Sequence, residues 1–273
     1  MSATSVRIRQ SAAPGVRLPA ALRSEAVKFF SLHLPRRLWL SAVVLAAACA
    51  ALFLTTTGAT QSESLDELSQ TDIAGTAALG IDAATLVAIV FGAWTVGGEY
   101  ASGMIRTSLI VTPSRVRLFS AKILWCAAVS VGCGAAAAAA VFAVAQALLL
   151  GYGVGPLDVN DPYLLRVIVG SAVMVPFYAT AAAASAFLCR STGGAVVIAL
   201  SLMFLPALIG VLPGGWQRVL LPFLPGPALH SLSGTAGPGD AEFLAPALAL
   251  FSLIVWTTVF LGGASAVFGR RDA

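Results

Sequence analysis

Apolar residues in this chain are gathered into six long runs, which short polar stretches separate. Each run has about the 20 residues that a helix needs to cross roughly 30 Å of hydrocarbon. The runs cover residues about 38–58, 76–97, 123–150, 164–188, 193–212 and 244–268. They predict an all-α integral membrane protein with six transmembrane helices.

The second run contains one carboxylate, Asp82, near its predicted start. An acidic side chain is favourable at a helix N-terminus, so we interpret Asp82 as a cap near the outer surface. The runs otherwise hold almost no charge. Transporters driven by proton or sodium gradients usually carry ionisable groups inside their spans, and this class is therefore disfavoured.

The chain before the first run divides into two parts. Residues 1–16 are rich in Ser, Ala and Arg without an apolar period, which predicts a disordered cytoplasmic tail. Residues 17–273 then form a single membrane domain. From Leu18 to Pro35 the apolar residues recur at helical spacing, with the basic residues mostly opposite them.

This pattern predicts a basic amphipathic helix along the inner headgroups, ended by Pro35. Leu22 and Phe29 lie on its apolar side, Lys28 on its polar side and Glu25 on the border. We expect these four residues to contact lipid headgroups. A simple linker turn is the alternative.

A second unusual segment, residues 214–225, precedes the last run. It is too apolar for a free loop and too rich in proline to span. We expect a re-entrant or interfacial piece in the outer leaflet, packed on protein so that its backbone polar groups are satisfied. The residues from Ser233 to Gly239 are then a turn.

The basic residues orient the six runs. Fourteen of the sixteen Lys and Arg residues fall on one side of the predicted topology, and only Arg166 and Arg218 fall on the other. Cytoplasmic loops of membrane proteins carry such an excess. We therefore expect a multi-pass protein of the inner (plasma) membrane with both termini in the cytoplasm.

Composition supports these predictions. The chain is 58% hydrophobic and 10% charged, with a mean hydropathy of +0.90, and soluble domains carry about a quarter charged residues. The net charge of +4 is spread beside apolar runs, as topology requires, so we expect no nucleic-acid partner. The four cysteines lie in or beside the runs without metal-ligand spacing and are interpreted as packing residues.

Catalytic patterns are missing from the sequence. It contains no phosphate-binding G-x-x-x-x-G-K-[ST] and no H-E-x-x-H, and His33 and His230 are its only histidines. We expect no metal, no cofactor and no enzymatic activity of its own. Any energy for transport then comes from outside this chain.

The connection between the second and third runs mixes charges, glycines and a proline. Glu99, Gly103 and Arg106 have helical spacing, which predicts one shared face. Thr112 or Ser114 provides a helix cap. We expect a short helix–turn–helix elbow at the inner surface, with Glu99 as a buried carboxylate. The alternative is a solvated cytoplasmic loop in which Glu99 pairs with Arg106 or Lys122 and no partner is needed.

This connection resembles the permease subunits of bacterial ATP-binding-cassette exporters of the second type, notably actinobacterial ones. Arg23, Glu25 and Lys28 also resemble the opening of such permeases. The residues that carry the likeness in the connection are Glu99, Tyr100, Gly103, Ile105, Arg106, Leu109, Pro113, Arg115 and Lys122. Met104 stands where the family usually has threonine.

The resemblance implies that residues 99–122 form a coupling element, with Glu99, Tyr100, Gly103, Arg106, Pro113, Arg115 and Lys122 as its site residues. The implied partners are a separate subunit, which binds ATP and magnesium, and a second permease copy or paralogue. The implied cargo is a hydrophobic or amphipathic compound moved outward. A secondary transporter and a non-transporting membrane scaffold are the alternatives.

Overall fold

The computed structural model describes residues 17–61, 69–153, 155–158 and 160–270. These residues are helical, with one isolated bridge between Pro238 and Asp240 and no strand. Six of the helical stretches are long and apolar enough to cross a membrane. The prediction of an all-α, multi-pass membrane protein is confirmed. The predicted disordered tail, 1–16, lies outside the described residues.

The elements follow the predicted order, and the fourth span is divided into two helices at Val173. They are α1 (Leu18–Ser31), α2 (His33–Gln61), α3 (Gln70–Ala101), α4 (Met104–Val111), α5 (Arg115–Gly151), α6 (Pro162–Ala172), α7 (Met174–Cys189), α8 (Thr192–Ile209), α9 (Gly214–Leu220), η1 (Leu221–Phe223), α10 (Pro225–Ser233) and α11 (Pro246–Arg270).

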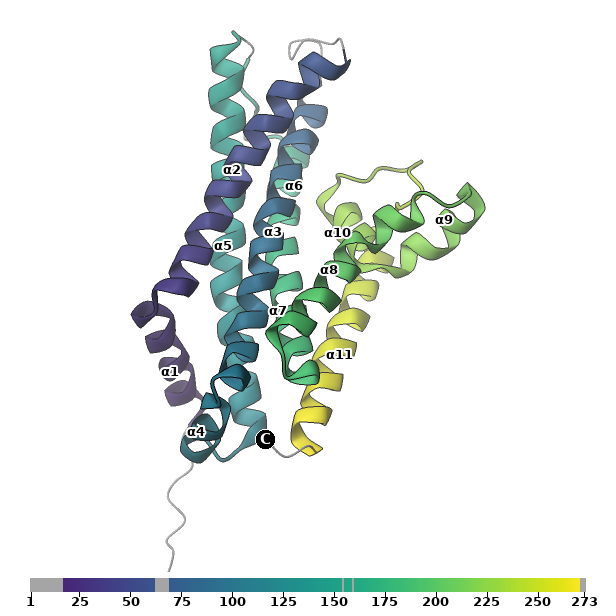
Figure 1. Cartoon of the computed structure of the whole chain (residues 1–273). Helices are drawn as coiled ribbons and strands as arrows, with labels where there is room; N and C mark the ends of the chain where they lie inside the picture. The colour runs from purple at the N-terminus through teal and green to yellow at the C-terminus, as the bar shows by residue number, and fades with distance from the viewer. Residues whose placement is uncertain (1–16, 62–68, 154, 159, 271–273) are drawn as a thin grey trace, which may run out of the picture.

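The long helices α2, α3 and α5 run side by side, and α8 to α11 form a shorter group on the other side of α7 (Figure 1). We call the end of the bundle that holds α4, the start of α1 and the end of α11 the basal end, and the opposite end the distal end. The basal end therefore brings together segments that are far apart in the sequence.

Small residues of α7 let the central helices approach closely. Ala179, Ala181–Ala184 and Ser185 are all buried. A Cβ added at Gly92 of α3 would overlap the backbone of Ala179. Backbone contact of this kind maximises van der Waals packing between membrane helices, which lack a hydrophobic driving force in lipid.

The prediction that Pro35 ends the first helix is wrong. The chain leaves the helix at Leu32, whose backbone is extended (φ −89°, ψ 141°), and α2 begins at His33. Pro35 lies in the first turn of α2, where a missing N–H breaks no helical hydrogen bond. The face of α1 that packs on the bundle contains Ala21 and Glu25, so Glu25 is buried and not at a border.

The interpretation of Asp82 as a helix cap is also wrong. The helix begins at Gln70, and Ser69 caps it by accepting a hydrogen bond from the backbone N–H of Asp72. The polar residues before the apolar run thus belong to the same helix. Asp82 lies in the fourth turn, half-buried within the span.

The segment before the last span is helical. It folds into α9, η1 and α10, which lie below the distal ends of α2 and α5 (Figure 1). The side-chain amide of Gln217 donates to the carbonyls of Gly210 and Leu212, at 2.8 and 2.7 Å, and so satisfies the end of α8. The depth of residues 214–225 in a bilayer stays a prediction. Of the turn expected from Ser233 to Gly239, residues 234–239 lie outside any helix, and Ser233 is the last residue of α10.

Candidate functional site

The chain turns sharply between α3 and α4. Gly103 has a left-handed backbone (φ 72°), which a glycine adopts without steric cost, and it separates the two helices. Because the helix is interrupted there, Glu99, Gly103 and Arg106 do not share one face, and that prediction is wrong. Arg106 is exposed on α4.

The predicted elbow is present between α4 and α5. Thr112 ends α4, Pro113 follows, and Ser114 precedes α5. The Ser114 hydroxyl accepts a hydrogen bond from the backbone N–H of Arg117, so Ser114 and not Thr112 is the cap.

Four charged side chains form a closed ring where α1, α3 and α5 meet. The Lys28 ammonium lies 2.7 Å from Glu25 and 2.6 Å from Glu99. Lys122 lies 2.6 Å from Glu99 and 3.2 Å from Glu25. We call these four residues the charge ring. Glu99 pairs with Lys122, which the solvated-loop alternative allowed, but the pair is buried. No ion pair joins Glu99 to Arg106 among the described residues.

The charge ring is almost dry. Lys122 is fully buried, Glu25 and Glu99 are 5% and 7% exposed, and only Lys28 reaches solvent appreciably. Burial lowers the pKa of Lys28, but the carboxylates of Glu25 and Glu99 outweigh it and hold that pKa above its usual value. Two positive and two negative groups balance one another, so the ring is electrically neutral as a unit.

One hydrogen bond joins α4 to the charge ring. The Ser108 hydroxyl donates to the second carboxylate oxygen of Glu99 at 3.2 Å. Glu99 therefore accepts from α1, α4 and α5 at once. A displacement of α4 changes the contacts of the group that also holds α1 and α5.

The outward face of α4 is apolar and has no partner in the described structure. Ile105 is the one buried residue of the helix. Ile110, Val111 and the nearby Val116 are 80%, 60% and 65% exposed, with Arg106 exposed beside them. We call Ile110, Val111 and Val116 the α4 patch. It lies at the extreme basal tip of the molecule (Figure 1).

The remaining predicted site residues surround the ring without joining it. The guanidinium of Arg190 lies 5.9 Å from the ring centre of Tyr100. Arg115 donates to the backbone carbonyl of Phe268 at 2.9 Å, which ties the start of α5 to the end of α11. Pro113 is exposed. Tyr100 and Arg115 thus fix helix ends at the base.

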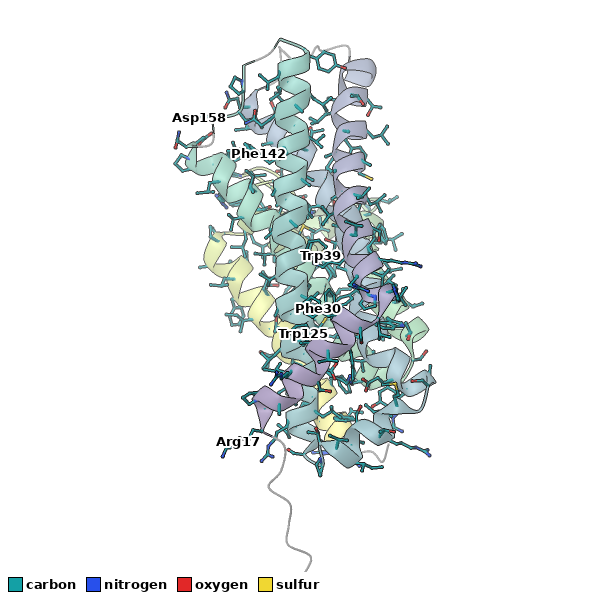
Figure 2. The ribbon with its side chains drawn as sticks, turned by 90° about the vertical axis from the view of Figure 1, so that its left-hand side faces the viewer. Arg17, Phe30, Trp39, Trp125, Phe142 and Asp158 are labelled. Carbon is teal, nitrogen blue, oxygen red and sulfur yellow. The ribbon has the colours of Figure 1, made fainter. Side chains whose placement is uncertain are left out.

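A cavity of about 300 Å³ opens beside the charge ring. Phe29 of α1 lies in it with its ring centre 6.2 Å from those of Phe91 and Trp125. Figure 2 shows Trp125 near the crossing of α1 over α5. Of the predicted interfacial residues, Glu25, Lys28 and Phe29 line this cavity, and Leu22 is half-buried outside it.

Sequence reasoning missed the burial of Glu25. The available signal was the spacing of Glu25 and Lys28, which places an acid and a base three residues apart, where their side chains can pair on one helix face. It also missed a second polar cluster in the distal half of the bundle, formed by Asp82, Tyr178, His230 and Glu242.

Comparison with known proteins adds no family to this geometry. No protein-family model matches the chain, and no curated protein matches it.

Proposed function

We propose that this chain is the membrane-spanning permease subunit of an ATP-binding-cassette exporter of the second type, and that α4 docks on a separate ATP-hydrolysing subunit. The chain moves a hydrophobic or amphipathic compound outward and binds neither ATP nor magnesium itself. The likeness of residues 99–122 to such permeases and the geometry of the basal end both support the proposal.

The observation that carries the proposal is the hydrogen bond from α4 to a buried charge ring. A short helix with an exposed apolar patch suits docking into a groove of another protein, because covering the patch removes apolar surface from water. The link from Ser108 to Glu99 passes a movement of α4 to α1 and α5. A solvated loop without a partner would need neither the exposed apolar patch nor the hydrogen bond between Ser108 and Glu99.

The orientation is part of the proposal. The basic residues gather toward the basal end, whereas Arg166 and Arg218 belong to α6 and α9. Positive-inside bias then places the basal end in the cytoplasm and the protein in the plasma membrane. The α4 patch accordingly meets a cytoplasmic subunit.

The proposed assembly contains two permease chains, either two copies of this one or this chain with a paralogue. Large apolar side chains on α8 and α11 remain uncovered in one copy: Val197 and Leu208 of α8 are 62% and 68% exposed, and Phe251 and Val259 of α11 are 64% and 59% exposed. A second chain and lipid share these faces. The amphipathic α1 lies along the inner headgroups in this arrangement.

The test is co-purification in lipid nanodiscs with the ATP-binding-cassette ATPases of the same organism, each expressed together with this chain. We expect association with the wild-type chain and its loss in Ile110→Ser, which weakens the α4 patch. Leu150→Ser is the matched control, because Leu150 is 66% exposed at the distal end of α5. Equal association of both variants, or none with the wild type, removes the support for the proposal.

A secondary transporter is the second candidate, and Asp82 is the observation that favours it. An ionisable group inside a span marks ion or proton pathways in many carriers. This candidate predicts transport that responds to a proton or sodium gradient with no nucleotide and no partner. Gradient-driven uptake by vesicles that contain this chain alone decides between the two.

A further inference from the structure

A large cavity in the distal half of the bundle is not part of the basal site. It has a volume of about 520 Å³, which is in the range of drug-sized ligand sites. It lies between α3, α7, α8 and α10, and the turn after α10 completes it. Leu86, Met174, Met203 and Phe204 supply much of its apolar wall.

The charged groups that line this cavity are mostly acidic. Asp82, Asp240 and Glu242 face one histidine, His230, and no lysine or arginine lines it. His230 lies 3.5 Å from Glu242, and the side chain of Asp240 accepts a hydrogen bond from the backbone N–H of Gly237. The cavity is therefore negative whether His230 is charged or neutral.

Two polar groups of the wall lack hydrogen-bond partners in the described structure. The carboxylate of Asp82 accepts no hydrogen bond and forms no ion pair with a Lys, Arg or His there. The hydroxyl of Tyr178 is also unpartnered, and this side chain is fully buried. The fully buried Tyr178 hydroxyl is therefore an unpaired polar group of the kind that costs free energy and is rare in native structures, whereas Asp82 is half-buried.

The hydroxyl of Tyr178 points toward the cavity. A Cβ added at Gly226, which lines the same space, would come within 3.4 Å of it. The absence of a side chain at residue 226 keeps this space open. Asp82 and Tyr178 both line this cavity.

We propose that this cavity binds an amphipathic organic cation, a protonated amine with an apolar body. The ammonium donates hydrogen bonds to the Asp82 carboxylate and the Tyr178 hydroxyl, and the apolar body packs on Met174, Met203 and Phe204. Charge-assisted hydrogen bonds of this kind are strong in a low-dielectric site. The role of the cation as exported cargo rests on the proposed function, whereas its binding does not.

The test measures binding to the purified chain alone, in nanodiscs and with empty nanodiscs subtracted. The probe is dansylcadaverine, a fluorescent primary ammonium compound. N-pentyl-dansylamide, which has the same body without the charge, is the matched probe. We expect saturable binding of dansylcadaverine and a dissociation constant at least tenfold higher for the uncharged probe.

Two variants locate the site. Asp82→Asn is expected to weaken dansylcadaverine binding at least tenfold, and Tyr178→Phe several-fold, with no effect of either on the uncharged probe. Asp72→Asn is the control, because it removes an exposed carboxylate from the start of the same helix. Tyr178→Phe deletes one oxygen from the fold and carries the test if Asp82→Asn does not fold.

The inference is overturned if both probes bind alike, or if Asp72→Asn weakens amine binding as much as the cavity variants do. These outcomes are independent of the partner. Lost amine binding with retained ATPase association removes the inference alone, and retained amine binding without association removes the proposed function alone.

Discussion

Beyond its first turn, α3 carries two carboxylates, Asp82 and Glu99, whose surroundings differ. Glu99, near the basal end, accepts hydrogen bonds from Lys28, Lys122 and Ser108. Asp82, seventeen residues or about 26 Å earlier on the same helix, accepts none in the described structure. The charge ring is complete without a ligand, whereas the distal cavity has unused hydrogen-bonding groups.

This difference separates two roles for charge inside a membrane protein. A neutral, closed ring joins helices and transmits their displacement, and it offers nothing to a ligand. The acidic wall of the distal cavity, with its unpartnered groups, stabilises the fold little and is suited to binding a cationic ligand. Substitutions that remove single groups from the charge ring and from the distal cavity test this difference.

The largest effect on the free energy of unfolding is expected from a substitution in the charge ring. Lys122→Met keeps the volume of the side chain but leaves Glu25 and Glu99 short of a partner in a dry site. We expect a loss of about 3–5 kcal/mol in the free energy of unfolding, because a buried charge is left uncompensated. Thermal unfolding of the purified chain in detergent measures it.

The control is Lys28→Met in the same ring. Lys28 is partly exposed, with 28% of its side chain accessible, so water can replace part of its interaction. A smaller loss of stability is expected. Equal and small losses in both variants would show that the ring does not hold the helices together.

A moderate effect on stability is expected from pH, through the ionisation of His230 at the distal cavity. Burial lowers the pKa of His230, but Glu242 and Asp82 outweigh it and raise that pKa above 6.5. The resulting stability is fully present below about pH 6.5 and is lost as the pH rises through the higher, folded pKa. Asp240 and Tyr178 also line the cavity and belong to the electrostatic surroundings of His230.

We expect this contribution to stay below about 1 kcal/mol, because both side chains are about one-third exposed. The melting temperature of the wild-type chain should therefore fall slightly between pH 6 and pH 9, relative to His230→Gln. An identical pH profile for the two proteins would refute the pairing of His230 with Glu242.

The smallest effect on stability is expected for Asp82→Asn. The carboxylate has no hydrogen bond in the described structure to lose, and the amide has nearly the same shape, so we expect a change of less than about 1 kcal/mol. Glu99→Gln in the same assay should cost clearly more. A loss for Asp82→Asn as large as for Glu99→Gln would mean that Asp82 has a structural role.

Much of the fold could be predicted from the sequence because apolar length is a local property. The six spans, their order and the elbow at Ser114 follow from runs, caps and breaks that lie close together in the chain. The end of α1 could not be placed, since proline is tolerated in a first helical turn and Pro35 lies in the first turn of α2.

The candidate sites were harder to predict because they depend on contacts between distant residues. Glu99 and Lys122 were paired from one local connection, but Glu25 comes from a helix 97 residues before Lys122. The distal cavity unites Asp82 with His230 and Glu242 from another part of the chain. A pattern along one helix holds no information on which other helix packs against it.

The central claim is that an ATP-hydrolysing subunit docked on α4 drives this chain. Transport by inverted membrane vesicles tests it most directly, with this chain present alone or with the ATPase that co-purifies with it. We predict accumulation of dansylcadaverine only when the chain, the ATPase and ATP are all present, and its loss in Ile110→Ser. Accumulation by the chain alone, with no ATP-consuming partner, would contradict the account.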